Sequence, residues 1–349
     1  MVSYPIKYKA AMIKEIGKPL EIVEIEFKGP LSDGQVLVKL FYSGVCGKQI
    51  EEIDGLGGPD AYLPHLTGHE GSAVVIDTSP GVSKVKKGDA VVLHWRKGSG
   101  TQSSTPDYTK NGEKINAGWI TTFNEYAVVS ENRITKIPND SNMLVAALMG
   151  CVVTTGVGVV FNDANVQTYD SVAVFGCGGV GLCAVQAARL RQPGLLIAVD
   201  INQNSLELAK KFGADVLINP QKDDVIKKIK EFTKGKGVTK TLVCTGSMTA
   251  IEAAVESTSI PGECFLVGVP QKGAKISVEA HAVMHERNIK GTLGGGSYPD
   301  RDIPTYMSLY DRGLLKLDEL VSVIKPFCEI NDVIKMMRGD TPGRVAVKF

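Results

Sequence analysis

The sequence predicts a mixed α/β protein in which a β-rich region precedes a doubly wound parallel sheet. Before about residue 150, short β-branched runs such as "QVLVKLFYSGV" and "FNEYAVV" alternate with Gly, Pro and Asp turns. After it, continuous apolar runs such as "SVAVF" and "LLIAV" alternate with helical patterns such as "GVGLCAVQAARL". Such alternation is typical of parallel strands that helices cover on both faces.

The alternation ends near residue 295. Helical patterns near 301–313 and 330–338 then precede a final strand, "RVAVKF". A chain of 349 residues predicts about two domains. We therefore divide the chain into a β-rich domain, a dinucleotide-type domain and a return segment, with the bounds 1–150, 151–294 and 295–349.

Composition excludes several classes of protein. The net charge of +1 gives no reason to expect a nucleic acid or a membrane surface as partner. There is no run of 18 apolar residues, and the charged N-terminus lacks the apolar stretch of a signal peptide. The seven cysteines form no dense framework, which predicts a reducing, cytoplasmic setting with free thiols or thiolate ligands.

A dinucleotide-binding fingerprint follows the run "SVAVF". Gly176, Gly178 and Gly181 have the spacing G-x-G-x-x-G between a predicted strand and a predicted helix. These glycines allow a tight turn, close approach to a pyrophosphate and close helix–strand packing. Asp200 ends the next strand, where its carboxylate would accept hydrogen bonds from a ribose. The free N–H groups of the helix start, at Gly179 and Val180, would face the phosphates.

Asp200 also predicts which dinucleotide binds. A carboxylate at this position repels a 2′-phosphate, and the following "INQN" supplies no arginine to neutralise one. We therefore expect NAD rather than NADP.

Three residues are candidate ligands of a metal: Cys46 in "GVCG", His69 in "GHEG" and Cys151 in "GCVVTTG". A catalytic zinc needs three protein ligands and an open fourth position. Each residue alone also fits an ordinary role, because single cysteines are often small buried hydrophobic residues. Glu70 is a carboxylate suited to hydrogen bonding around such a site. His94 could face the cleft or point away from it.

The order of these motifs resembles the zinc-type medium-chain dehydrogenases, the superfamily of alcohol and polyol dehydrogenases. "GVCG", "GHEGSAVV", "VFGCGGVGL", "VCTGS", "VGVP" and "GRVAVKF" follow one another as in that family, over essentially the whole chain. The resemblance implies a GroES-like catalytic domain with an inserted Rossmann domain. It also implies that Cys46, His69 and Cys151 bind zinc, with Glu70 as the nearby acid.

The same resemblance implies roles for residues further along the chain. Thr155 should pack beside a nicotinamide, and Trp95 falls where the family has a wall of the substrate pocket, although plain core packing would suit it as well. The remaining cofactor contacts implied in this way are Thr245, the backbone from Val267 to Val269, and Arg344, which should reach the pyrophosphate.

Three departures from the family pattern modify these expectations. Many members hold a structural zinc with four cysteines, whereas the corresponding segment 96–118 has none, so we expect one zinc and a polar surface loop. Lys48 stands where a Ser or Thr usually passes on the substrate's proton, and it is a candidate general acid–base or electrostatic clamp. Gln49 replaces an Asp and would orient the ligand histidine without adding charge, although Glu51 lies close enough in sequence to compensate.

The predicted activity is reversible hydride transfer between an alcohol, or a polyol or sugar-like hydroxyl, and NAD. Zinc would lower the pKa of the substrate hydroxyl. Two alternatives remain open: a zinc-independent quinone or enoyl reductase on the same fold, and a non-catalytic NAD-binding redox sensor or scaffold. The small-molecule substrate is not specified, and the resemblance implies a homodimer or homotetramer.

Overall fold

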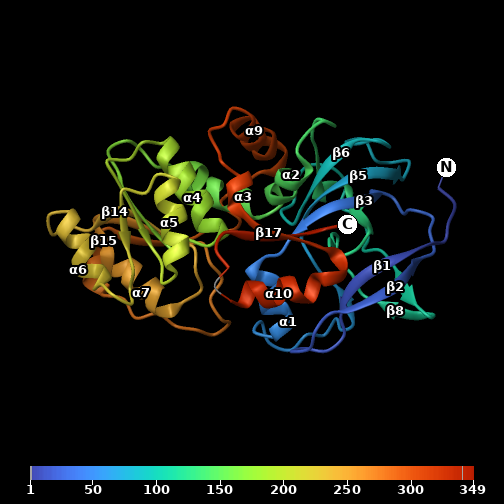
Figure 1. Ribbon diagram of the computed structural model, residues 1–349, viewed down its shortest axis with the longest axis horizontal. Helices are drawn as coiled ribbons and strands as arrows, with labels where there is room; N and C mark the ends of the chain where they lie inside the picture. The colour runs from blue at the N-terminus through green and yellow to red at the C-terminus, as the bar shows by residue number, and fades with distance from the viewer. Residues whose placement is uncertain (1, 340) are drawn as a thin grey trace.

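The computed structural model describes residues 2–339 and 341–349, which form three β-sheets and their covering helices. In Figure 1 the first two sheets lie to the right and the third to the left, with α3 (Val152–Gly158), α9 (Pro299–Asp311) and β17 (Val321–Pro326) between them. The mixed α/β class predicted from the sequence is confirmed.

The first two sheets belong to the β-rich region. The five-stranded sheet has the order β4 (His65–Leu66), β1 (Ile6–Ile13), β2 (Glu21–Phe27), β7 (Tyr108–Lys110) and β8 (Glu113–Ile115). The seven-stranded sheet has the order β10 (Ile134–Lys136), β6 (Ala90–His94), β5 (Glu70–Thr78), β3 (Gln35–Gly44), β18 (Arg344–Lys348) and β17, with β9 (Tyr126–Ser130) also paired to β3.

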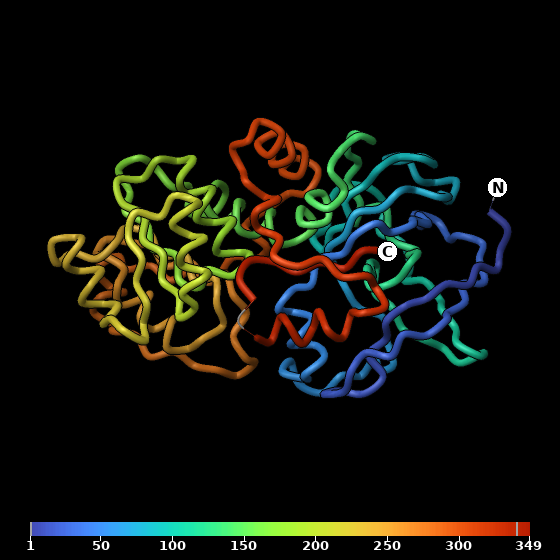
Figure 2. The backbone as a smooth tube through the Cα atoms, in the orientation of Figure 1, coloured from blue at the N-terminus to red at the C-terminus, as the bar shows by residue number. Residues whose placement is uncertain are grey.

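The seven-stranded sheet includes residues from the end of the chain. β18 pairs antiparallel with β3, where Ala346 lies opposite Gly44, and parallel with β17 on its other side. Figure 2 shows the path: the chain leaves the third sheet and returns to end among the strands of the first region. The return segment is therefore built into the β-rich part of the molecule.

The third sheet is entirely parallel. Its strands have the order β13 (Val216–Ile218), β12 (Leu195–Val199), β11 (Ser171–Phe175), β14 (Val238–Val243), β15 (Thr258–Leu266) and β16 (Arg287–Gly291). The order reverses between β11 and β14, and ligands of such sheets bind beyond the strand ends at this point. The connecting helices are α4 (Gly179–Leu190), α5 (Gln203–Lys211), α6 (Val225–Phe232), α7 (Met248–Ser257) and α8 (Ala280–Met284).

Helix α3 fixes the third sheet against the β-rich region. An added Cβ on Gly156 would lie 2.3 Å from the carbonyl oxygen of Val180, so α3 and α4 pack backbone against backbone. The largest core cluster continues through this contact, from Val92 in β6 to Val174 in β11. The remaining helical segments are α1 (Gly47–Asp54), α2 (Met143–Met149), α10 (Ile330–Arg338), a π-helical turn (Val159–Asp163) and short 3₁₀ turns at Glu131–Arg133, Asp318–Leu320 and Phe327–Glu329.

Among the described residues, no single helix is long and apolar enough to cross a membrane. A bent pair in the described part of the chain, Met143–Met149 and Val152–Asp163 with an angle of 57° between its parts, reaches the necessary length and composition.

Segment 96–118 differs from the polar loop that the sequence predicts. It contains the hairpin β7–β8, which extends the five-stranded sheet. Tyr108 and Ile115 are buried in that sheet's core, at 0% and 1% exposure. Two apolar side chains therefore anchor a stretch whose other residues are mostly polar.

Candidate active site

Cys46, His69 and Cys151 lie together although they are far apart in sequence. Cys46 precedes α1, His69 lies between β4 and β5, and Cys151 precedes α3. Their three ligand atoms are all within 4.8 Å of one another, and His69 Nε2 is 3.3 Å from Cys151 Sγ. Ligand atoms around a tetrahedral zinc are about 3.5–4 Å apart. Two thiols and one imidazole at this spacing therefore fit a zinc ion.

The two thiols shift each other's pKa in opposite directions. A hydrogen bond from Cys151 holds the pKa of Cys46 well below its ordinary value, and the positive charge of Arg344 acts in the same direction. The hydrogen bond with Cys46, together with burial, raises the pKa of Cys151. Burial alone would lower the pKa of His69, but the hydrogen bond and charge of Cys46 raise it. The surroundings thus favour the thiolate form of Cys46, which is the form that binds a metal.

Gln49 orients the histidine of this cluster. It is 1% exposed, and its Oε1 accepts a hydrogen bond from the Cys46 N–H at 3.0 Å. Its amide nitrogen contacts His69 Nδ1, which leaves Nε2 facing the thiols. Lys48, the preceding residue, points outward with 41% of its side chain exposed and forms an ion pair with Glu51 at 3.1 Å. Glu51 therefore pairs with Lys48.

Glu70 and Arg344 form a buried ion pair beside the cluster. They are 0% and 3% exposed, and Glu70 Oε2 also accepts the N–H of Val152 at 3.1 Å. Burial raises the pKa of Glu70, although Arg344 opposes the shift. An added Cβ on Gly179 would lie 3.3 Å from Arg344 Cδ, so the arginine also contacts the glycine-rich turn. One ion pair thus connects the metal-type cluster, α3 and the fingerprint.

The fingerprint glycines have the geometry that a dinucleotide site requires. Gly176 has a φ of +86°. An added Cβ on Gly181 would lie 1.8 Å from the Gly176 carbonyl oxygen, whereas one on Gly178 would meet nothing within 4 Å. Gly178 therefore leaves open the space in front of the turn. Asp200 accepts hydrogen bonds from the N–H groups of Cys177 at 2.5 Å and Asn202 at 2.7 Å, which fixes its carboxylate beside the turn.

The other residues implied as cofactor contacts lie around this turn and α3. An added Cβ on Gly176 would lie 3.0 Å from Thr245 Cβ. Val267 and Val269 follow β15, and Val269 is 61% exposed. Thr155 lies in α3, with its carbonyl against the glycine loop that follows β16: an added Cβ on Gly295 would lie 2.3 Å from that oxygen.

His94 is the last residue of strand β6, and Trp95 follows it. His94 is 1% exposed, its Nδ1 donates to the Arg96 carbonyl at 2.7 Å, and burial lowers its pKa to about 4. It is therefore a neutral structural residue. Trp95 is partly exposed, and its ring edge lies against Gly294.

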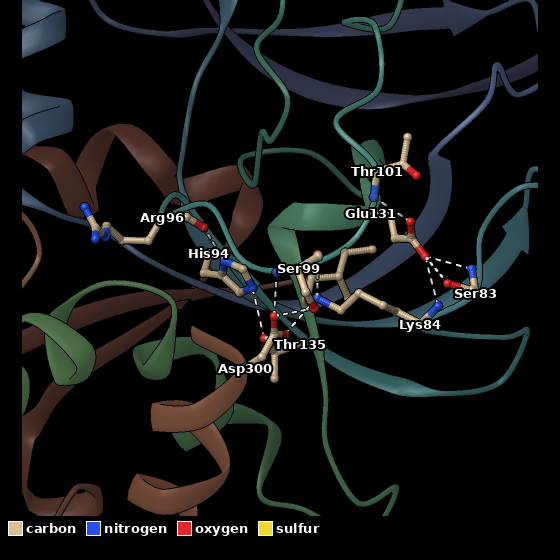
Figure 3. Close-up of polar contacts among 10 residues, drawn as sticks. Ser83, Lys84, His94, Arg96, Ser99, Thr101, Glu131, Thr135 and Asp300 are labelled. Carbon is tan, nitrogen blue, oxygen red and sulfur yellow. Dashed lines mark hydrogen bonds and ion pairs between the residues drawn. The ribbon is translucent and has the colours of Figure 1, made fainter. Parts of the chain in front are cut away.

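Sequence reasoning missed a polar network that fastens segment 96–101 (Figure 3). Glu131 accepts hydrogen bonds from the N–H groups of Ser83 at 2.7 Å, Lys84 at 2.9 Å and Thr101 at 2.7 Å. Asp300, at the start of α9, accepts from the Ser99 N–H at 2.6 Å and forms an ion pair with Lys84 at 2.7 Å. No sequence pattern marks single acids whose partners are up to about 200 positions away.

Comparison with known proteins identifies the class that this fold and site define. Residues 32–139 match the family model of the alcohol dehydrogenase GroES-like domain, and residues 179–312 match that of the zinc-binding dehydrogenases. The chain therefore belongs to the zinc-type medium-chain dehydrogenases, a family of oxidoreductases.

Particular relatives narrow the comparison. An S-(hydroxymethyl)glutathione dehydrogenase of Escherichia coli O6:H1 is 34% identical, with 99% of this chain and 100% of the relative aligned. Among solved structures, an alcohol dehydrogenase zinc-binding domain protein from Burkholderia ambifaria superposes with a TM-score of 0.92 at 27% identity, over 99% of this chain and 100% of the other. Benzyl alcohol dehydrogenase from Acinetobacter calcoaceticus gives 0.89 at 28% identity, over 99% of each chain.

Proposed function

We propose that the protein is a zinc- and NAD-dependent dehydrogenase that oxidises an alcohol reversibly to the aldehyde or ketone. The observation that carries this proposal is the placement of Cys46, His69 and Cys151 one helix, α3, away from the open glycine turn at Gly178. With zinc and the dinucleotide bound, this placement would bring a Lewis acid and a hydride acceptor close to each other. The alcohol dehydrogenases among the relatives support the same reaction class.

The chain's own residues would bind and orient these groups. The thiols of Cys46 and Cys151 and the Nε2 of His69 would hold the zinc, which supplies a Lewis acid that lowers the pKa of a substrate hydroxyl. Gln49 keeps the imidazole turned toward the site. The buried Arg344 offsets the charge of Glu70, so that the protein around the two thiolates stays close to neutral.

Binding of NAD would rest on Asp200 and the glycine turn. Its carboxylate is fixed by two backbone N–H groups and still has free lone pairs for ribose hydroxyls. The same negative charge disfavours a 2′-phosphate. Thr155, Thr245 and the backbone from Val267 to Val269 would place the nicotinamide near the metal, with Arg344 next to the pyrophosphate.

Lys48 stands at the position from which a proton would leave the cleft. Its exposed ammonium and its ion pair with Glu51 connect the start of α1 with solvent. We propose that it either moves the proton or holds the substrate electrostatically. Replacement by Met changes the pH dependence of kcat if it moves the proton, and changes mainly KM if it holds the substrate; a Lys48→Met enzyme with unchanged kinetics excludes both roles.

We also propose one zinc per chain, because segment 96–118 has no cysteine and is fastened by carboxylates. A homodimer or homotetramer is the expected assembly.

Two measurements on the purified protein test the function. Metal analysis should find one zinc per chain in the wild type. Cys151→Ser should lose the zinc, whereas the control Cys328→Ser, whose thiol is exposed and distant in sequence from the cluster, should keep it. A panel of primary, secondary, cyclic and sugar-like alcohols should then reduce NAD, followed by absorbance of NADH. Absence of zinc would favour the zinc-independent quinone or enoyl reductase. Full zinc with no turnover of any alcohol would favour the non-catalytic NAD-binding protein.

A further inference from the structure

Trp95 and Arg96 stand between the metal-type cluster and the glycine loop that follows β16. The β5–β6 register places Glu70 opposite His94, so the next residue, Trp95, lies at the level of His69. On the other side, an added Cβ on Gly294 would lie 2.9 Å from both Trp95 Cζ2 and Arg96 Cδ. The pair is therefore placed where it could contact the proposed substrate.

Arg96 carries a positive charge that the protein does not neutralise. Its Nε donates to the Ser297 carbonyl at 3.3 Å, and its guanidinium lies 5.7 Å from the centre of the Trp95 ring. Within residues 2–339 and 341–349, no carboxylate forms an ion pair with Arg96, and its Nη groups have no hydrogen bond. The neighbouring Lys84 is different, because it is paired with Asp300.

Trp95 supplies a second donor without an acceptor. Its indole N–H is buried and has no hydrogen-bond partner in the described part of the chain. An unmade hydrogen bond at a buried donor costs roughly 1–3 kcal/mol. The Trp95 N–H and the Nη groups of Arg96 are therefore donors that an acceptor on a ligand could satisfy, whereas the Nε of Arg96 already binds the Ser297 carbonyl.

The backbone that carries Arg96 is held in place before any ligand binds. The buried His94 donates to the Arg96 carbonyl at 2.7 Å, the Gly98 N–H donates to the Asn132 carbonyl at 2.8 Å, and Ser99 is held by Asp300. Figure 3 shows the Arg96 side chain extending away from this network, on the side opposite Asp300. The network orders the segment and leaves the guanidinium free, which lowers the entropic cost of binding.

We propose that Arg96, supported by the ring of Trp95, binds an anionic group of the substrate, namely a carboxylate remote from the reacting hydroxyl. The planar guanidinium presents parallel N–H groups that match a carboxylate. This assignment rests on the proposed dehydrogenase function and specifies its substrate class: alcohols that carry a carboxylate.

The test compares two substrates that differ only in charge. 4-(Hydroxymethyl)benzoate and the neutral 4-(hydroxymethyl)benzamide have nearly the same shape. The wild-type enzyme should favour the benzoate in kcat/KM, and Arg96→Gln should reduce that preference about tenfold, mainly through KM. Arg96→Lys keeps the positive charge but lacks the two parallel N–H groups of a guanidinium, so it should recover part of the preference. Lys97→Gln is the matched control. It also removes one positive charge, but from the exposed side chain of the next residue.

Equal kcat/KM for the two substrates in the wild type, or an equal loss of preference in Lys97→Gln, would overturn the assignment. So would a weaker NADH affinity in Arg96→Gln with an unchanged preference, because the anion would then belong to the cofactor.

A binding measurement separates this assignment from the proposed function. Calorimetry with the zinc- and NADH-loaded protein compares 4-carbamoylbenzoate with terephthalamide, neither of which is an alcohol. Tighter binding of the benzoate that depends on Arg96 supports the anion site even if no alcohol is oxidised, and equal binding of the two refutes it.

Discussion

Replacement of Glu131 by Gln tests whether carboxylates fasten the segment that lacks cysteines. The Glu131 side chain is almost completely buried, and its two oxygens accept three backbone N–H groups. A glutamine can keep the oxygen that serves Ser83 and Lys84. Its NH₂ group then faces the N–H of Thr101, so one buried donor loses its acceptor and the other two bonds lose their charge.

The expected loss of stability follows from these contacts. A hydrogen bond to a charged group contributes roughly 1.5–3 kcal/mol, and an unsatisfied buried N–H adds to the loss, which gives about 2–4 kcal/mol in total. With an unfolding entropy of about 0.7 kcal/mol/K for 349 residues, Tm should fall by about 3–6 °C.

The pH dependence of this loss has a defined sign. Burial alone would raise the pKa of Glu131, but the N–H groups of Thr101, Lys84 and Ser83 hold it below its ordinary value. The stabilisation by ionised Glu131 is therefore present above about pH 4.3 and is lost as the pH falls through the lowered pKa. The difference between wild type and variant should be largest at neutral pH and should narrow below about pH 4.

Calorimetry and intrinsic fluorescence measure both effects. The only two tryptophans of the sequence, Trp95 and Trp119, flank the segment, and the Trp119 indole donates to the Ser103 carbonyl at 3.0 Å. Glu113→Gln, at an exposed position of β8, is the control and should change stability by less than about 0.5 kcal/mol. If Glu131→Gln has the same Tm as this control, the Glu131 carboxylate does not hold the segment in place.

Three further predictions concern the site and its surroundings. Burial lowers the pKa of His94 to about 4, whereas an unfolded histidine titrates near 6.5, so the free energy of unfolding should fall by up to about 1.4 kcal/mol per pH unit from pH 6.5 to 4. His94→Gln should flatten this decline, measured by urea unfolding across that pH range. A slope equal to that of the wild type would contradict the prediction. Gln49→Ala should weaken zinc binding about 10- to 100-fold in competition with a chelator, and unaltered affinity would show that the amide does not orient His69. Gly178→Val should keep the wild-type Tm and lose NADH binding, because the added side chain enters only the open space of the turn. Gly181→Ala should instead lower Tm, because its Cβ would meet the Gly176 carbonyl oxygen. A lower Tm in Gly178→Val with NADH binding retained would refute the assignment of the turn.

Local sequence patterns predicted the third sheet well because each strand is one apolar run. "SVAVF" and "LLIAV" correspond to β11 and β12 residue for residue, and the helix between them begins at Gly179 as the fingerprint requires. The sequence did not reveal α2, because "MLVAALM" is apolar on every side and such a run does not distinguish a helix from a strand. The hairpin β7–β8 was missed for the opposite reason, since only Tyr108 and Ile115 anchor it.

The site was predictable where a residue type has a restricted chemistry. Two cysteines and a histidine in motif order indicate a metal, and the structure brings Cys46, His69 and Cys151 together. The contacts between side chains were not predictable. The ion pair of Glu70 with Arg344 joins positions 274 residues apart, and Glu51, a possible partner for the metal site, pairs with Lys48. Pairing over such distances depends on the completed fold, which no local pattern encodes.

The position of β18 has a consequence for how the molecule is made. This strand comes later in the chain than every other strand of its sheet, yet it lies between β3 and β17. During synthesis, the edge of β3 that pairs with Ala346 and Val347 therefore remains without its neighbour until the dinucleotide-type domain has left the ribosome. Arg344 begins the same strand, so Glu70 lacks its counter-charge for the same period, and the two regions can complete the metal-type cluster only after the last strand has been inserted.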